Sequence, residues 1–429
     1  MNPSPRNKLF LMMVLQFFIW GAWLPLIFGY LPAMGLSEAE QKLILSAFPV
    51  AAIIGMFFSN QFADRNFAAE KFLAFSHLVG GLAMAALAWV KFDRPPVPGG
   101  QLAPALYDGA FWMFFILMAV HCLLYVPTIS ITNSIAFSHM KDSQKEFGFV
   151  RMGGTIGWIL AAWPIAYILY GKAAAEVIQA TSAIFMISGV AALALAAFSL
   201  TLPHTPPNKA SGSDNLAWLK AAKLLGIPAI LILFIATFID ATIHNGYFVM
   251  GERFIKKVLI AGDIDGAWST VVMSLGQVAE IFTMLILGRV LAKFGWRITL
   301  IVGILGHAAR FAVFAFFPQH TWVIVGVQLL HGICYAFFFA SVYIYIDAVF
   351  PKDIRTSAQG LFNFLILGIG DLAAKWLFIP LQGKYLTGDG LAGYEKLFLV
   401  PTGLALAAAV LLALFFHPEK VAAPAAVAH

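Results

Sequence analysis

The stretch that decides the fold is Thr201–Asn215, TLPHTPPNKASGSDN, which is rich in proline and polar residues and lies near the middle of the chain. On each side of it lie about six apolar runs of roughly 20 residues, the length of a helix that crosses a bilayer's hydrocarbon core. Backbone groups inside lipid are satisfied only within a helix or a closed barrel, so the sequence predicts spanning helices. Two sets of six spans around a polar hinge are typical of a secondary transporter.

Composition supports a membrane protein. Hydrophobic residues make up 61% of the 429 residues and charged residues 11%, against about 25% charged in a soluble domain. Although the net charge is +6, the lysines and arginines lie in short loops between apolar runs. We therefore interpret them as topology signals and expect no nucleic-acid partner. Cys122 and Cys334 fall inside expected spans and predict no disulfide framework.

We expect an all-α integral membrane protein with twelve transmembrane helices in two six-helix halves. The expected spans are 9–32, 42–62, 70–90, 111–138, 148–171, 175–200, 219–251, 267–292, 297–317, 321–347, 356–382 and 392–416. The domains are then an N-terminal half (1–200), a cytoplasmic linker (201–218), a C-terminal half (219–417) and a cytoplasmic tail (418–429). Positive charge gathers in the N-terminus, the linker and the loops after even-numbered spans, which predicts cytoplasmic termini. We expect a monomer in the inner (plasma) membrane, surrounded by lipid.

Two loops at equivalent places of the two halves have related sequences. One is Asn60–Lys71, between spans two and three, and the other is Gly288–Arg297, between spans eight and nine. Both resemble, imperfectly, the G-x-x-x-D-R-x-G-R-R-K loop of the major facilitator superfamily. A carboxylate and a cation at a helix end can latch neighbouring helices in one state and release them in another. We therefore expect a gating role for Asp64, Arg65, Lys293 and Arg297.

Ionisable side chains inside spans are functional candidates, because each costs about 2.5–3.5 kcal/mol at mid-helix. The candidates are Arg151, Asp240, His244, Glu280, His307, Arg310, His331, Asp347, Asp371 and Lys375. In span five, Arg151, Thr155 and Trp158 recur on one helical face. In span eight, Gln277 and Glu280 are three residues apart and also share a face.

Structural roles compete with functional ones at several of these positions. Arg310, Asp371 and Lys375 have the composition of an interhelical ion-pair group. The glycines of span five, Gly153, Gly154 and Gly157, suit close packing of membrane helices. A discontinuity near Pro228, or in the glycine-rich span five, would widen a cavity between the halves.

Longer blocks run in order across almost the whole chain. They are Leu15–Trp23, Tyr125–Asn133, Arg151–Gly157, Thr201–His204, Met273–Glu280, Ala309–Ala315 and Ile354–Gly360. Together they resemble the nucleoside:proton symporter family of the major facilitator superfamily. The resemblance implies the twelve-helix major facilitator fold, a central nucleoside site and proton coupling.

The resemblance also implies which residues bind the substrate. Carried over, these are Arg151, Thr155, Trp158, Asn245, Gln277 and Glu280, and Thr242 aligns with a longer polar site residue. Span ten departs from the family, because His331 stands where a tyrosine is expected and Tyr335-Ala336 where a Phe-Asp pair is expected. The aspartate of that pair is absent here, so the contact to the sugar, and with it the exact substrate, is expected to differ from the family's.

Nucleoside chemistry fits the polar set without the family. Ribose hydroxyls and base edges need amide, hydroxyl and carboxylate partners, and the flat base can stack on Trp158, Tyr335 or Phe338. Since the chain has no GxxxxGK[ST] loop, we expect an ion gradient as the driving force and no cofactor. Glu280 is the preferred proton carrier because it is expected to lie deep in its span, and Asp240 is the second choice.

Three alternatives remain open from the residues. The same polar set could bind the hydroxyls of a sugar or another polyol in a proton-coupled symporter. An amphiphile transporter of the same superfamily is also compatible. An integral-membrane enzyme would need a clustered His/Asp motif, and the sequence has none at metal-ligand spacing, so we expect no enzyme and no metal site.

Overall fold

The computed structural model describes residues 5–55, 66–92, 107–140, 143–207, 222–350, 355–386, 388 and 390–418. Every regular element within these ranges is a helix, as predicted. Ten helical segments of this part of the chain are long and apolar enough to cross a membrane. The chain divides into two compact units, Met1–Ser213 with Ala267–Val271 and Asp214–Gly266 with Val272–His429.

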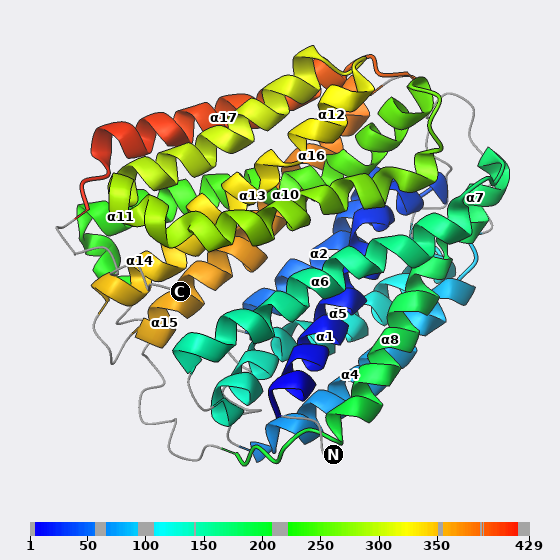
Figure 1. Cartoon of the computed structure of the whole chain (residues 1–429). Helices are drawn as coiled ribbons and strands as arrows, with labels where there is room; N and C mark the ends of the chain where they lie inside the picture. The colour runs from blue at the N-terminus through cyan, green and yellow to red at the C-terminus, as the bar shows by residue number, and fades with distance from the viewer. Residues whose placement is uncertain are drawn as a thin grey trace. The chain divides into compact units, whose positions relative to one another are not determined.

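The first unit contains the helices drawn from blue to green in Figure 1. They are α1 (Pro5–Ala33), α2 (Glu38–Ile54), α4 (Ala69–Ala86) with the short turn η2 (Leu87–Trp89), α5 (Gly109–His139), α6 (Ser143–Leu169), α7 (Ala174–Thr181) and α8 (Ala183–Ser199). Helix α1 packs against α6 and α8, and α4 packs against α5 and α8. Helix α2 packs against α5.

Local sequence explains how these helices begin and approach one another. At the start of α2, Ser37 Oγ accepts from the Glu40 N–H, and the Ser37 N–H donates to Glu40 Oε2, a reciprocal cap. Helices α1 and α6 touch at backbone distance, since a Cβ atom on Gly157 would lie 2.0 Å from the carbonyl oxygen of Val14. The glycines of α6 therefore serve close packing, as their spacing suggested.

The second unit contains the remaining elements. They are η4 (Leu224–Gly226), α10 (Pro228–Ala261), η5 (Gly266–Trp268), α11 (Ser269–Phe316), α12 (Thr321–Val327), α13 (Leu330–Cys334), η6 (Tyr335–Ala340), α14 (Ser341–Val349), α15 (Arg355–Asn363), η7 (Phe364–Ile369), α16 (Gly370–Tyr385) and α17 (Tyr394–Phe415). Helix α10 packs against α16 and α17. Helix α11 holds two of the expected spans, and the chain bends between them at Gly295, where φ is 72°.

Pro228 does not interrupt a span, so that expectation is wrong. It occupies the first turn of α10, where a missing N–H costs nothing, and the helix runs on to Ala261 rather than ending near 251. The irregular segments lie elsewhere, in the π-helical turns η6 and η7. Such turns are frequent at functional sites, and here they fall within spans ten and eleven.

Candidate functional site

In the first unit, the predicted face of span five lies beside α1. The Arg151 guanidinium covers the Phe17 ring at 4.3 Å, and the Trp158 ring meets Trp20 edge-on at 5.3 Å. Arg151, Thr155 and Trp158 are all partly exposed on the continuous helix α6. The arrangement therefore leaves one cation, one hydroxyl and one flat ring available along a single helical face.

Beneath that face, a polar group ties three helices together. Gln16 Nε2 donates to Thr128 Oγ1 at 2.9 Å, and Gln16 Oε1 lies 2.9 Å from His77 Nε2. The Tyr125 hydroxyl donates to the Gln16 carbonyl at 2.6 Å. All four side chains are buried, so this group joins α1, α4 and α5. The sequence analysis did not single out Gln16, which lies within the block Leu15–Trp23.

In the second unit, a carboxylate and an imidazole meet in the core. His307 Nδ1 on α11 lies 2.9 Å from Asp240 Oδ1 on α10, and both side chains are 0% exposed. A buried carboxylate needs such a partner, because an isolated charge in an apolar interior is very costly. The sequence marked both residues but did not pair them, since they are 67 positions apart.

A second buried series of side-chain contacts begins at Arg310. Its Nη1 lies 2.9 Å from His331 Nδ1, and its guanidinium covers the Tyr247 ring at 4.0 Å. On the other side of the imidazole, His331 Nε2 lies 3.2 Å from the side-chain amide of Gln277. Arg310 is therefore not part of a group with Asp371 and Lys375, which pair with each other one turn apart on α16. Of the pair or triad expected from these three residues, the structure has the Asp371–Lys375 pair, which lies within one helix rather than between helices.

His244 lies between the Asp240–His307 pair and the Arg310–His331–Gln277 contacts. Its ring stacks on His331 at 5.2 Å between centroids and meets His307 edge-on at 5.7 Å. Tyr335 lies 6.0 Å from the same ring. The three histidines thus form one aromatic and titratable cluster between α10, α11 and α13.

The remaining predicted substrate residues of this unit have varied surroundings. Asn245 Nδ2 donates to the carbonyls of Ala241 and Ile366, the second of which belongs to η7. The Thr242 hydroxyl donates to the Phe238 carbonyl in its own helix. Asn245 therefore satisfies backbone freed by a π turn, which a sequence pattern cannot show.

Two further residues lie at different depths. Glu280 follows Gln277 by one turn on α11 and is partly exposed rather than fully buried. Phe338 is 0% exposed, its backbone lies against Gly303, and its ring meets Phe339, which in turn contacts His244. The structure therefore gives Phe338 a packing role within its unit.

The two loop signatures differ in what the structure describes. Asp64 and Arg65 lie outside the described residues. Lys293 and Arg297 flank the bend at Gly295, where Lys293 is exposed and Arg297 partly exposed. Within the described ranges, no group of three or more His, Cys, Asp and Glu side chains is arranged to hold a metal ion.

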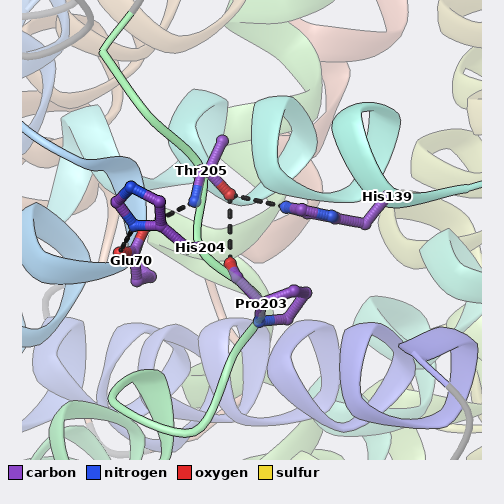
Figure 2. Close-up of polar contacts among 5 residues, drawn as sticks. All are labelled: Glu70, His139, Pro203, His204 and Thr205. Atoms are coloured by element: carbon purple, nitrogen blue, oxygen red, sulfur yellow. Dashed lines mark hydrogen bonds and ion pairs between the residues drawn. The ribbon is translucent and has the colours of Figure 1, made fainter.

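A polar contact that the sequence did not predict holds the segment after α8 (Figure 2). Glu70, at the start of α4, accepts from the Thr205 N–H at 2.9 Å and contacts His204 Nδ1 at 2.8 Å. The Ala69 N–H donates in return to the Thr205 carbonyl at 3.0 Å. The Thr205 hydroxyl donates to the Pro203 carbonyl and so accepts from His139 Nε2 at 2.8 Å. The sequence pointed to this segment only through the block Thr201–His204, which resembles the family.

A helical membrane protein in two compact units, with a buried titratable cluster and polar residues along its spans, has the features of a secondary transporter. A family model described as nucleoside H+ symporter matches residues 4–95 and 96–421. The chain therefore belongs to the nucleoside H+ symporter family, and it is a transporter rather than an enzyme.

Individual relatives agree. The chain is 31% identical to the putative nucleoside transporter YegT of Escherichia coli, over 85% of this chain and 81% of that protein. It is 27% identical to the xanthosine permease of Escherichia coli, over 97% and 98% of the two chains. The crystal structure of the nucleoside transporter NupG superposes with a TM-score of 0.80 at 22% identity, covering 98% of this chain and 100% of that one. These comparisons confirm the predicted family and the twelve-helix major facilitator fold.

Proposed function

We propose that the protein imports nucleosides together with protons by alternating access. Family membership carries this function, and the buried titratable cluster of the second unit supports its proton-coupled form. The test is uptake of labelled uridine and adenosine into proteoliposomes, with and without an imposed proton gradient. Sugars, free bases and nucleotides serve as competitors, so a sugar symporter would reveal itself in the same assay.

The proposed substrate contacts are those of the co-facial polar sets. They are Arg151, Thr155, Trp158, Thr242, Asn245, Gln277, Glu280, His331 and Tyr335. The partly exposed cation, hydroxyl and ring of α6 support the first three, since they suit a base edge and its face. The amide of Gln277 and the carboxylate of Glu280, one turn apart, suit hydroxyl groups.

Glu280 is the proposed proton carrier. It is partly exposed in mid-span, so it can lie in water in one state and out of water in another. Glu280→Gln keeps the shape but cannot titrate, and should keep nucleoside exchange while losing gradient-driven accumulation. Accumulation that still follows the imposed gradient in this variant would exclude Glu280 as the carrier. Asp240, which has His307 as a partner, is the second candidate.

The two loop signatures are proposed to act on conformational switching. Lys293 and Arg297 flank a bend that a change of state can alter, and Asp64 with Arg65 stands in the equivalent loop. Asp64→Asn should slow transport and leave equilibrium binding within a few-fold of the parent. A large loss of binding in a well-folded variant would contradict this division of labour.

The cellular setting is proposed from charge and from the family. We propose that the chain is a monomer in the inner membrane with both termini in the cytoplasm, driven by the proton gradient without a cofactor. Cysteine accessibility labelling of variants at each terminus, from each side of the membrane, tests this orientation.

A further inference from the structure

Arg310 determines which ring nitrogen of His331 carries the hydrogen. A guanidinium has five N–H donors and no acceptor, so the nitrogen that faces it must offer a lone pair. Arg310 Nη1 faces His331 Nδ1 at 2.9 Å. His331 is therefore the tautomer with its proton on Nε2, and a second proton on Nδ1 would set two donors against each other.

That tautomer fixes the amide of Gln277 in turn. His331 Nε2 is a donor and lies 3.2 Å from the Gln277 amide, so the amide must present its oxygen there. The oxygen position away from His331 is buried and has no hydrogen-bond partner among the described residues. A half-turn of the amide gives the His331 proton its acceptor and places the NH₂ group at that unpartnered position.

Close packing keeps the three side chains in register. A Cβ atom on Gly276 would lie 2.7 Å from His331 Cβ, and one on Gly332 would lie 2.5 Å from the carbonyl carbon of Ala279. Helices α13 and α11 therefore touch at backbone distance beside Gln277. Arg310 is 0% exposed and held over the Tyr247 ring, so it has little freedom to leave His331.

We propose that Arg310 is a positioning residue that acts through His331 to turn the NH₂ group of Gln277 toward the substrate. The substrate atom at that place is then a hydrogen-bond acceptor, an oxygen of the ribose or of the base. This inference rests on the proposed role of Gln277 in nucleoside binding and adds the direction of its hydrogen bond. His331, which stands in place of the family's tyrosine, contacts both Arg310 and Gln277 and so transmits the effect.

The test compares Arg310→Met with Arg310→Lys by measuring uridine and adenosine binding to purified protein between pH 5.5 and pH 8. In Arg310→Met, no donor faces His331 Nδ1, so either tautomer of the buried imidazole can form. The Nδ1 tautomer presents a lone pair to Gln277, which turns the Gln277 NH₂ group toward His331 and away from the substrate. Nucleoside binding should therefore weaken by up to about tenfold across this range. Arg310→Lys keeps a donor and should bind close to the parent.

Other titratable groups near His331 are His244 and Tyr247 on α10 and His307 on α11. They are unchanged in both Arg310 variants, so a second substitution separates their effect. In a His331→Phe background, Arg310→Met should weaken binding no further. Tyr247→Phe removes the bond to Gln328 but keeps the ring under Arg310, so its affinity should match the parent. Parent-like binding by Arg310→Met, or no rescue by Arg310→Lys, would overturn the proposal.

A second measurement does not depend on substrate. Nitrogen NMR of histidine-labelled parent protein, assigned with His331→Phe, should show His331 protonated on Nε2 alone across this pH range. A signal from the Nδ1 tautomer would overturn the proposal, whereas a parent that binds no nucleoside but shows the expected tautomer would overturn only the proposed function. Comparing uridine with 2′-deoxyuridine and uracil in Gln277→Ala and parent protein distinguishes a ribose oxygen from a base oxygen.

Discussion

Asp240 and His307 form an ion pair or a neutral hydrogen bond at 2.9 Å, depending on one proton, with neither side chain exposed. A proton on His307 is compensated by the carboxylate, so the pair can hold that proton without leaving a bare charge in the core. His244 lies beside His307, and His331 lies beside His244. The proton site of this pair and Gln277, a proposed substrate contact, are thus separated by two imidazole rings.

We predict that Asp240→Asn destabilises the protein more at low pH than at high pH. At high pH a neutral His307 can still donate from Nδ1 to the Asn oxygen, so little is lost. At low pH a protonated His307 has lost its counter-charge, while Arg310 and His244 nearby remain as before. The difference in melting temperature between parent and variant should grow as the pH falls from 8 to 5.5. A constant difference would show that the pair does not hold a proton in this range.

Arg151→Ala should weaken nucleoside binding by about 1–3 kcal/mol, the cost of leaving a polar partner unsatisfied. Arg151→Lys should recover only part of this loss, because a lysine cannot bond a base edge with two parallel N–H groups. Isothermal titration with uridine and adenosine measures both. Unchanged affinity in a folded Arg151→Ala variant would remove α6 from the proposed site.

Gly157→Ala should destabilise the first unit by about 1–3 kcal/mol or more, since the added methyl group would overlap the Val14 carbonyl. Gly148→Ala is the matched control in the same helix, because nothing lies within 4 Å of its added Cβ. That control should be neutral or slightly stabilising through helix propensity. Thermal unfolding in detergent compares the two, and equal melting temperatures would contradict the close approach of α1 and α6.

Glu70→Gln should lower the unfolding free energy by about 1–3 kcal/mol, because the Thr205 N–H and His204 lose a charged acceptor. Glu395→Gln is the control, since Glu395 is an exposed acid in the first turn of α17. It should have little effect, and similar losses in both variants would assign the effect to the helix end rather than to the contact with Thr205.

The sequence predicts the fold well because the physics of the bilayer is local. Span length and apolar content depend on neighbouring residues alone, and the span containing Arg151, Thr155 and Trp158 formed one helix as its periodicity indicated. Pro228 was misread because a proline in an apolar run can either break a helix or begin one. The bend at Gly295 fits the loop signature, which places a glycine there.

Pairings between helices could not be predicted in the same way. Asp240 with His307 and Arg310 with His331 depend on how α10, α11 and α13 are rotated, which apolar composition leaves open. The contact of Glu70 with Thr205 joins residues 135 positions apart. The sequence marked Asp240, His307, Arg310 and His331 as ionisable residues inside spans, but it did not show which of them are partners.

The attachment of Thr205 to Ala69 and Glu70 has a practical meaning for protein engineering. Thr205, the sixth residue after α8, is held to the start of α4 by backbone and side-chain hydrogen bonds. A cleavage site, fluorescent tag or fusion partner inserted before Thr205 would therefore pull apart a folded region. The same insertion after Pro207 would leave those contacts intact, and so marks where the chain can be opened to study each half alone.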